Sequence, residues 1–186
     1  VAGAIIGIAE RSRIINGSKV RPGDAVIGLE SSGLHTNGYT LARNILLKKY
    51  NVNNYIPSLK MSIGRALLKP HKNYCKDVFS VMDKISIKGI AHITGGGLVD
   101  NIPRILPEGC GVQLDQKLWK ILPVFRLIQK LGRVPGNDMY RTFNMGIGMI
   151  LIVDNKDRDS ALRRVKRSHI IGQVVKGKGV KINGQD

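Results

Sequence analysis

Hydrophobic positions along the chain follow two patterns. Residues 25–29 are a continuous apolar run after the turn residues Pro22, Gly23 and Asp24, which is typical of a strand in a protein core. Residues 39–50 instead repeat their apolar side chains about every third or fourth position, which predicts a helix with one buried face. Both patterns recur, so the sequence predicts a chain in which strands and helices alternate.

The predicted elements indicate a fold class. Residues 51–61 are polar and are expected to form an irregular connection, and residues 14–20 a short hairpin or turn. The loose alternation, with antiparallel-looking pairs at both ends, favours an α+β fold, a mixed β-sheet covered by helices, in a single domain of residues 1–186. Strands are expected at residues 1–9, 25–29, 87–93, 111–114, 146–153, 170–175 and 180–182, and helices at residues 39–50, 62–69, 73–85, 98–102, 123–131, 137–143 and 157–167.

The start of the chain is unusual. It opens on Val1 and continues directly into the apolar segment 1–9, which is expected to be a buried strand. A natural terminus rarely opens inside a hydrophobic strand, because that edge would need covering. We therefore expect the chain to be a fragment that lacks an N-terminal part.

Composition excludes several classes of protein. Of 186 residues, 42% are hydrophobic, which is enough for a core and argues against disorder. No apolar run reaches the roughly 18–20 residues of a membrane span. Cys75 and Cys110 form neither a metal motif nor a disulfide framework, so we expect reduced thiols in a cytoplasmic protein.

The strongest compositional signal is charge. The chain has 30 Lys and Arg against 13 Asp and Glu, a net charge of +17, which invites a nucleic-acid interpretation. The basic residues are spread along the chain with a mild excess in residues 158–186, and only 5% of residues are aromatic, too few for a base-stacking surface. We expect no nucleic-acid partner and no membrane partner; a basic nucleic-acid-binding domain is kept as an alternative.

The first candidate site is the loop of residues 31–38, between a core strand and a helix. Its glycines free the backbone, and the amides at the start of the following helix carry a partial positive charge that suits a phosphate or a carboxylate. The alternative is an ordinary turn in which Thr36 or Asn37 caps the helix. The candidate residues are Ser32, Gly33, His35, Thr36, Asn37 and Gly38.

A second loop, residues 91–97, also leads from a strand into a helix. Gly95, Gly96 and Gly97 remove side chains where a backbone or a ligand comes close, although neither the dinucleotide pattern nor the P-loop pattern is present and a hinge is the alternative. His92 lies inside the predicted strand, and we interpret it as a core or subdomain-contact histidine rather than a catalytic one.

The third loop, residues 139–149, offers Arg141 as a bidentate anion ligand, with Thr142 and Asn144 before a strand. Acidic residues are scarce in all three loops. We therefore expect no metal ligands in this chain, and any Mg²⁺ site in the missing N-terminal part.

These loops, in this order, resemble the C-terminal domain of the phosphoribosylformylglycinamidine cyclo-ligase (aminoimidazole ribonucleotide synthetase) family. The Ser-Gly-x-His-x-Asn-Gly pattern is shared with a wider superfamily that includes formylglycinamide ribonucleotide amidotransferase, selenophosphate synthetase, thiamine monophosphate kinase and a hydrogenase maturation protein. Ile-Thr-Gly-Gly-Gly, Asn-Ile-Pro-Arg and Met-Tyr-Arg-Thr-Phe-Asn-x-Gly point to the cyclo-ligases. Thr36 stands where the family commonly has Ser. The matching stretches are residues 1–3, 17–20, 23–24, 31–39, 91–97, 101–104 and 139–149.

The resemblance implies an ATP-dependent ligase of purine biosynthesis that converts formylglycinamidine ribonucleotide to aminoimidazole ribonucleotide, ADP and phosphate. It implies that His35 polarises the reacting centre while the other candidate residues line the same cleft and hold phosphate. It further implies an N-terminal domain with most ATP and Mg²⁺ contacts, a homodimer, and no activity for this fragment alone. Another ATP-using enzyme of the superfamily, of the amidotransferase or selenophosphate synthetase type, is the alternative.

Overall fold

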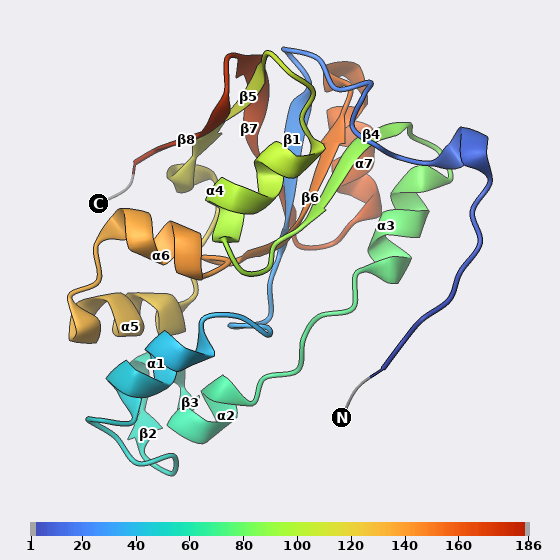
Figure 1. Ribbon diagram of the computed structural model, residues 1–186. Coiled ribbons are helices and arrows are strands. Elements are labelled where there is room, and N and C mark those ends of the chain that lie inside the picture. Colours follow the sequence, from blue (N-terminus) through green and yellow to red (C-terminus); the bar gives the residue numbers. More distant parts are fainter. Residues whose placement is uncertain (1–2, 185–186) are drawn as a thin grey trace.

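The sheet of this protein is built around strand β1, whose two neighbours are β6 and β7 (Figure 1). The structure is a computed structural model and describes residues 3–184. The strand order is β4-β6-β1-β7-β5-β8; all neighbours are antiparallel except β5 and β8, which are parallel. The six strands are β1 (Ala25–Glu30), β4 (Ile87–His92), β5 (Cys110–Asp115), β6 (Ile147–Val153), β7 (Ser168–Lys176) and β8 (Gly179–Asn183).

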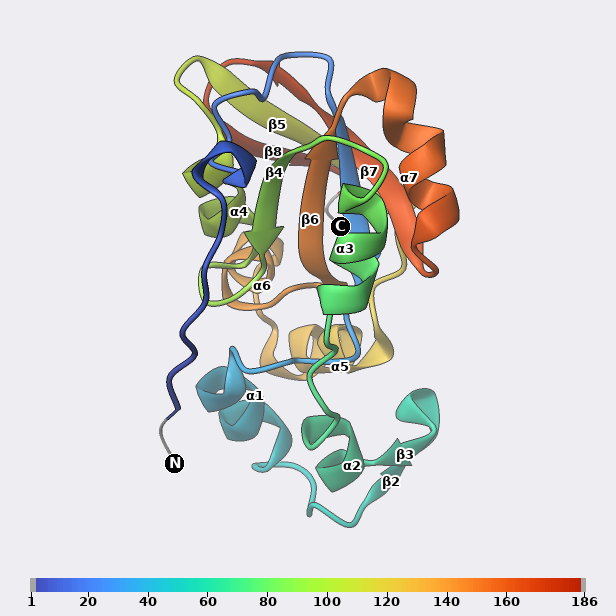
Figure 2. The ribbon, with the colours of Figure 1, turned by 90° about the vertical axis from the view of Figure 1, so that its right-hand side faces the viewer.

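Helices cover both faces of the sheet (Figure 2). Helices α3 and α7 lie on one face, and α4 and α6 on the other, while α5, α1, α2 and the small β2-β3 hairpin extend beyond one end of the sheet. The helices are α1 (Tyr39–Leu46), α2 (Ile63–Leu67), α3 (Cys75–Met82), α4 (Gly97–Asn101), α5 (Pro123–Gly132), α6 (Gly136–Thr142) and α7 (Arg158–Arg164), and the hairpin strands are β2 (Tyr55–Ile56) and β3 (Met61–Ser62). Short 3₁₀ helices occupy Arg11–Arg13, Pro57–Leu59, Ile102–Ile105, Gln116–Leu118 and Asn155–Asp157.

Residues 25–29 of strand β1 are apolar because both faces of the strand are buried there, and the strand ends on the partly buried Glu30. Ala25, Ile27 and Leu29 pack in the cluster beneath α3 and α7, whereas Val26 belongs to the larger cluster on the opposite face. Side chains of a strand alternate between faces, so a strand covered on both sides needs a continuous apolar run rather than an alternating one. This is the pattern that the sequence shows.

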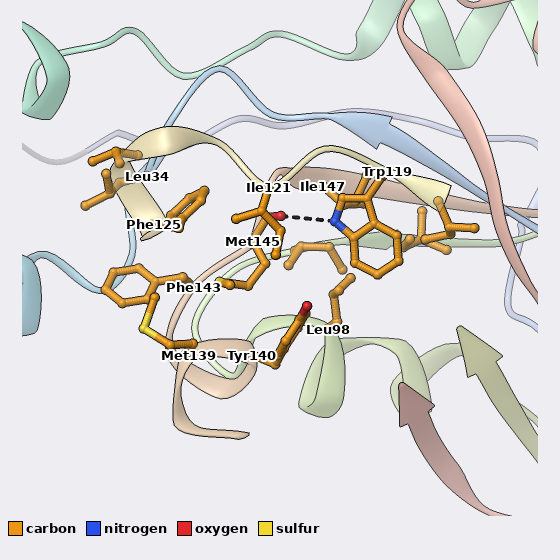
Figure 3. Packing of buried hydrophobic residues seen from close by; sticks show 14 of the residues in the cluster. Leu34, Leu98, Trp119, Ile121, Phe125, Met139, Tyr140, Phe143, Met145 and Ile147 are labelled. Atoms are coloured by element: carbon orange, nitrogen blue, oxygen red, sulfur yellow. Dashed lines mark hydrogen bonds between the residues drawn. The ribbon is translucent and has the colours of Figure 1, made fainter. Parts of the chain in front are cut away.

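The larger core also fixes the third loop (Figure 3). Trp119 is buried, and its indole Nε1 donates a hydrogen bond to the Met145 carbonyl oxygen at 3.1 Å. Phe143 packs against Phe125 of α5, with ring centroids 5.5 Å apart. The loop before β6 is therefore held from the core side, which leaves its other side for the neighbouring loops.

The predicted fold class is confirmed, and every predicted helix matches a helix of the structure to within a few residues. Three expectations are wrong in detail. Residues 3–9 form no strand and are exposed, because no neighbouring strand covers them, and residues 1–2 lie outside the described residues. Residues 51–61 contain most of the β2-β3 hairpin rather than only a connection. At the C-terminal end, where an antiparallel pair was expected, β8 instead pairs in parallel with β5.

No helix within residues 3–184 is both long enough and apolar enough to cross a membrane.

Candidate functional site

The sheet topology brings the three predicted loops to one edge. Strand β6 lies between β1 and β4 and runs antiparallel to both, so the ends of β1 and β4 meet the start of β6. The Ser31 amide donates to the Gly146 carbonyl at 2.8 Å, and the Ile93 amide to the Gly148 carbonyl at 2.9 Å. The three loops therefore form one surface, in line with the shared cleft that the family resemblance implies.

Asn144 holds the first loop in place from within the protein. Its side chain is 3% exposed, and its Nδ2 donates to the carbonyl oxygens of Gly33 at 2.9 Å and Leu34 at 3.3 Å. Its Oδ1 accepts from the Ser31 hydroxyl at 2.8 Å and from the Gly146 amide at 2.9 Å. The side-chain amide group thus has all its hydrogen-bond partners inside the fold. Asn144 therefore positions the loop and, contrary to the expectation, does not line a cleft.

Asn101, which is not among the residues predicted from the sequence, has the same role for the glycine loop. It is 4% exposed, and its Nδ2 donates to the carbonyl oxygens of Gly97 at 2.8 Å and Gly95 at 3.1 Å. The Thr94 hydroxyl donates to its Oδ1 at 3.1 Å. The Asn-Ile-Pro-Arg motif was part of the family resemblance, but nothing in the residue types revealed that its Asn turns back onto the loop.

Two glycines are needed because protein atoms approach them closely. A Cβ on Gly97, which has φ +58°, would lie 2.0 Å from the Tyr140 carbonyl oxygen of α6. A Cβ on Gly38, which has φ +77°, would lie 2.3 Å from the Phe143 ring. The close approach predicted for the glycine triplet exists at Gly97, and at both Gly97 and Gly38 the approaching group belongs to the protein itself. Gly95 differs: it is exposed, and Asn37 Oδ1, 3.5 Å away, is the nearest atom to its Cβ position.

The start of helix α1 is open toward this surface. Its N-cap is Gly38, which has no side chain to accept from the first amides, so the interpretation of Thr36 or Asn37 as the cap is wrong. Thr36 is exposed, and its Oγ1 accepts a 3.4 Å hydrogen bond from Asn37 Nδ2. The uncapped amides carry a partial positive charge, which is the property that the sequence predicted for this loop.

Arg141 and Thr142 lie at the C-terminal end of α6. The Arg141 guanidinium is 59% exposed and pairs with the Asp100 carboxylate of α4 at 3.2 Å. This exposed pair joins α6 to α4, the helix that follows the second loop. It partly satisfies the guanidinium that was expected to bind an anion. Thr142 is half-buried beside it.

His35 is the most constrained residue of the site. Its backbone is left-handed, with φ +61°, which costs a residue other than glycine about 1–3 kcal/mol and occurs preferentially at functional sites. The residue is 4% exposed, and its Nε2 lies 3.1 Å from both the amide nitrogen and the Oγ of Ser32. Its Nδ1 is buried and has no hydrogen-bond partner. One polar atom of the ring is therefore available for a ligand.

Two further histidines complete a histidine cluster, defined as His35, His71 and His92. The rings of His35 and His71 stack with centroids 3.9 Å apart, and the Nε2 atoms of His71 and His92 are 3.1 Å apart. His92 is exposed at the end of β4, so its interpretation as a core residue is wrong. Neither the apolar pattern nor a motif pointed to His71, which lies between α2 and α3.

The environment keeps His35 neutral. Burial lowers the pKa of His35 from 6.5 to about 4, and repulsion from His71, His92 and Lys72 adds to the shift. Burial likewise lowers the pKa of His92. A neutral imidazole near pH 7 can donate or accept a hydrogen bond, or offer a lone pair, without carrying charge.

The lowered pKa predicts a loss of stability in acid. Below pH 6.5 a histidine of the unfolded chain takes up a proton that folded His35 refuses until about pH 4, so the free energy of unfolding falls across this window. We expect the free energy of unfolding of His35→Asn to change less with pH across this window, because asparagine tolerates a positive φ and does not titrate. Urea midpoints measured across the window test this, with His169→Asn as the control. Equal slopes for the wild type and His35→Asn would contradict the assignment.

Comparisons with known proteins agree with this arrangement. The sequence pattern of the family described as "AIR synthase related protein, C-terminal domain" matches residues 21–185. The chain belongs to this family. It is 46% identical over 185 residues to the phosphoribosylformylglycinamidine cyclo-ligase of Pseudothermotoga lettingae, covering 97% of this chain and 55% of that protein. It is 41% identical over 190 residues to the Bacillus cereus protein of the same name, covering 99% and 55%.

Solved structures confirm the fold of this AIR synthase C-terminal domain. The thiamine-monophosphate kinase of Stenotrophomonas maltophilia matches with a TM-score of 0.63 at 15% identity, covering 95% of this chain and 55% of that chain. The hydrogenase maturation protein HypE of E. coli matches with a TM-score of 0.58 at 19% identity, covering 90% and 48%. The domain therefore spans about half the length of the proteins that it matches.

Proposed function

We propose that this AIR synthase C-terminal domain forms one wall of the active cleft of a phosphoribosylformylglycinamidine cyclo-ligase. The observation that carries the proposal is the single surface made by the three loops. On this surface the loop that contains the buried His35 leads directly into the uncapped start of α1. Cyclo-ligase relatives that are 41–46% identical over nearly the whole chain support it.

The loops would hold phosphate groups of formylglycinamidine ribonucleotide or of ATP. Backbone amides around Asn37 and Gly38 supply dipoles, and Ser32 and Thr36 supply hydroxyl groups. Gly95 leaves open surface for a ligand next to Asn37. Gly33, Gly96, Gly97 and Asn144 would act by fixing the backbone, and Arg141 with Thr142 would border the cleft from α6.

The chemistry requires an amide oxygen to leave as the ring closes. ATP, when bound, supplies the phosphoryl group that makes this oxygen a leaving group. The task of this domain is then to orient the substrate and to stabilise charge at fixed dipoles in a site that excludes water. His35 suits this role, because its ring is neutral near pH 7 and locked in place by burial.

The described residues do not fit Mg²⁺. This ion takes mainly carboxylate and other oxygen ligands, whereas within residues 3–184 the one close group of three or more potential metal ligands consists of histidines. Asp100 is paired with Arg141. We therefore assign no step through Mg²⁺ to this chain. The family resemblance favours Mg²⁺ and most ATP contacts in a further domain, a homodimeric enzyme and a cytoplasmic location. HypE has been crystallised with ATP, and the thiamine-monophosphate kinase of Aquifex aeolicus with AMPPCP.

A chimaeric enzyme tests the proposed function. The C-terminal part of the Pseudothermotoga lettingae protein is replaced by this chain, which is 46% identical to it. We expect ADP release that depends on formylglycinamidine ribonucleotide, and none from the chain alone. A soluble, folded chimaera without this activity would refute the proposal.

His35 is expected to be essential in that chimaera. His35→Asn keeps the left-handed backbone but removes the imidazole, and we expect turnover to fall by about tenfold or more, the scale of a lost acid–base or polarising group. His169→Asn is the control, because His169 pairs with Glu30 outside the cluster. Unchanged turnover in His35→Asn would exclude the catalytic role.

A further inference from the structure

The histidine cluster has the spacing of a metal site. The His71 and His92 Nε2 atoms lie 3.1 Å apart, and one ligand nitrogen from each of the three histidines lies within 4.8 Å of the others. Two nitrogens on a tetrahedral zinc ion, each about 2.0–2.1 Å from the metal, are about 3.3 Å apart. His71 and His92 therefore approach the separation that one shared ion requires.

His35 contributes the unexplained polar atom. Its Nδ1 is buried and unpartnered whichever tautomer the ring adopts. If Nε2 accepts from the Ser32 amide, an Nδ1–H is left without an acceptor. If Nε2 carries the proton, it can donate to Ser32 Oγ, whose own hydrogen goes to the Pro70 carbonyl at 2.6 Å, and the Ser32 amide then loses Nε2 as its acceptor. The second tautomer leaves an Nδ1 lone pair with no use inside the fold, and a metal ion would supply its partner.

One side chain must turn for all three rings to share an ion. The His35 and His71 rings are 18° from parallel, so their in-plane lone pairs run side by side and do not converge. His71 lies on the irregular segment between α2 and α3, and it reaches the surface. His35 is locked by burial, whereas His71 is carried by an irregular segment, so His71 is the ligand that we expect to reorient.

We infer that His35, His71 and His92 bind a divalent transition metal ion of imidazole preference, with Zn²⁺ the best match. Imidazole suits zinc, copper and nickel, whereas magnesium and calcium select oxygen ligands. Three protein ligands leave a fourth position for water or for another ligand, as in open zinc sites. The inference does not depend on the proposed function, because it concerns binding to the chain itself.

Electrostatics around the cluster are compatible with a cation. His35 and His92 have lowered pKa values and are neutral near pH 7, which is the state that binds metal. Lys72 is the nearby positive group, and it pairs with the Asp77 carboxylate at 2.9 Å. Its charge is thus partly compensated within the same segment.

Calorimetric titration of the untagged chain with ZnCl₂ near neutral pH tests the inference, and titration with CoCl₂ reports the ligand geometry by its visible absorption. We expect one Zn²⁺ per chain, and a loss of affinity of about tenfold or more in His71→Ala and in His92→Ala. Both residues reach the surface, so these variants are expected to fold. MgCl₂ is expected to give no binding heat.

His169→Ala is the matched control, since His169 is the fourth histidine and lies outside the cluster. It should bind Zn²⁺ like the wild type. The inference is overturned if the wild-type chain does not bind Zn²⁺ with one-to-one stoichiometry, if His71→Ala binds it unchanged, or if His169→Ala weakens binding as much as the cluster variants do. These outcomes are independent of cyclo-ligase turnover, so failure here leaves the proposed function standing.

Discussion

Gly97→Ala is expected to lower the free energy of unfolding by about 3 kcal/mol or more, the sum of backbone strain and overpacking. The added Cβ would lie 2.0 Å from the Tyr140 carbonyl oxygen, and the backbone of α6 cannot yield as a flexible side chain could. The φ of +58° adds strain for any residue with a Cβ. Urea unfolding followed by circular dichroism measures the loss.

Gly109→Ala separates the two causes. Gly109 has a φ of +78°, but nothing lies within 4 Å of its Cβ position. This variant should show the strain alone, about 1 kcal/mol. If Gly97→Ala cost no more than Gly109→Ala, the close contact between the glycine loop and α6 would not be a determinant of stability.

Asn144→Ala is the second large effect, with an expected loss of about 3–5 kcal/mol, because buried groups left without partners cost about 1–3 kcal/mol each. The variant leaves the Gly146 amide and the Gly33 carbonyl without their hydrogen-bond partner, and it deprives the Ser31 hydroxyl of its acceptor. Asn144→Asp keeps the acceptor oxygen but replaces the Nδ2 donor, so it should also be destabilised.

The same substitution at Asn37 is the control for this prediction. Asn37 lies in the loop that Asn144 holds, yet its side chain makes a long, exposed hydrogen bond of 3.4 Å to the neighbouring Thr36 Oγ1. Asn37→Ala should therefore change the free energy of unfolding by less than about 0.5 kcal/mol. Comparable losses in the two variants would mean that the four contacts of Asn144 do not hold the loop.

The sequence predicted strands where burial forces a regular pattern. Residues 25–29 and 146–153 are continuous apolar runs because both faces of β1 and β6 are covered, and such runs are readable without a structure. Residues 3–9 are equally apolar but form no strand, because a hydrophobic run does not say whether a partner strand is present. Strand pairing depends on the whole fold, so a hydrophobic run alone does not predict whether a segment joins a sheet.

The candidate site was predictable to the level of its loops. Gly38, His35 and Asn144 were found because glycines and polar residues between strand and helix are costly unless they are needed. The sequence did not show which of the predicted residues face the surface and which hold a loop from inside the protein, because this depends on which side chains turn inward. The exposure of His92 could have been predicted. Within β4 it lies on the same, less buried face as Lys88, and a lysine in a strand indicates a face that reaches solvent.

The position of β1 at the centre of the sheet has a consequence for how the site is made. Its partners β6 and β7 begin more than a hundred residues later in the sequence, at Ile147 and Ser168. Pairing over such separations is slow, because a long loop must close before any contact compensates its entropy. During synthesis the apolar β1 segment emerges long before anything can cover it, and the edge that carries the loops does not exist until β6 has joined. We therefore expect assembly of this surface to be a late event in folding, after the last strands have left the ribosome, with the unpaired β1 segment as the stretch most exposed to aggregation until then.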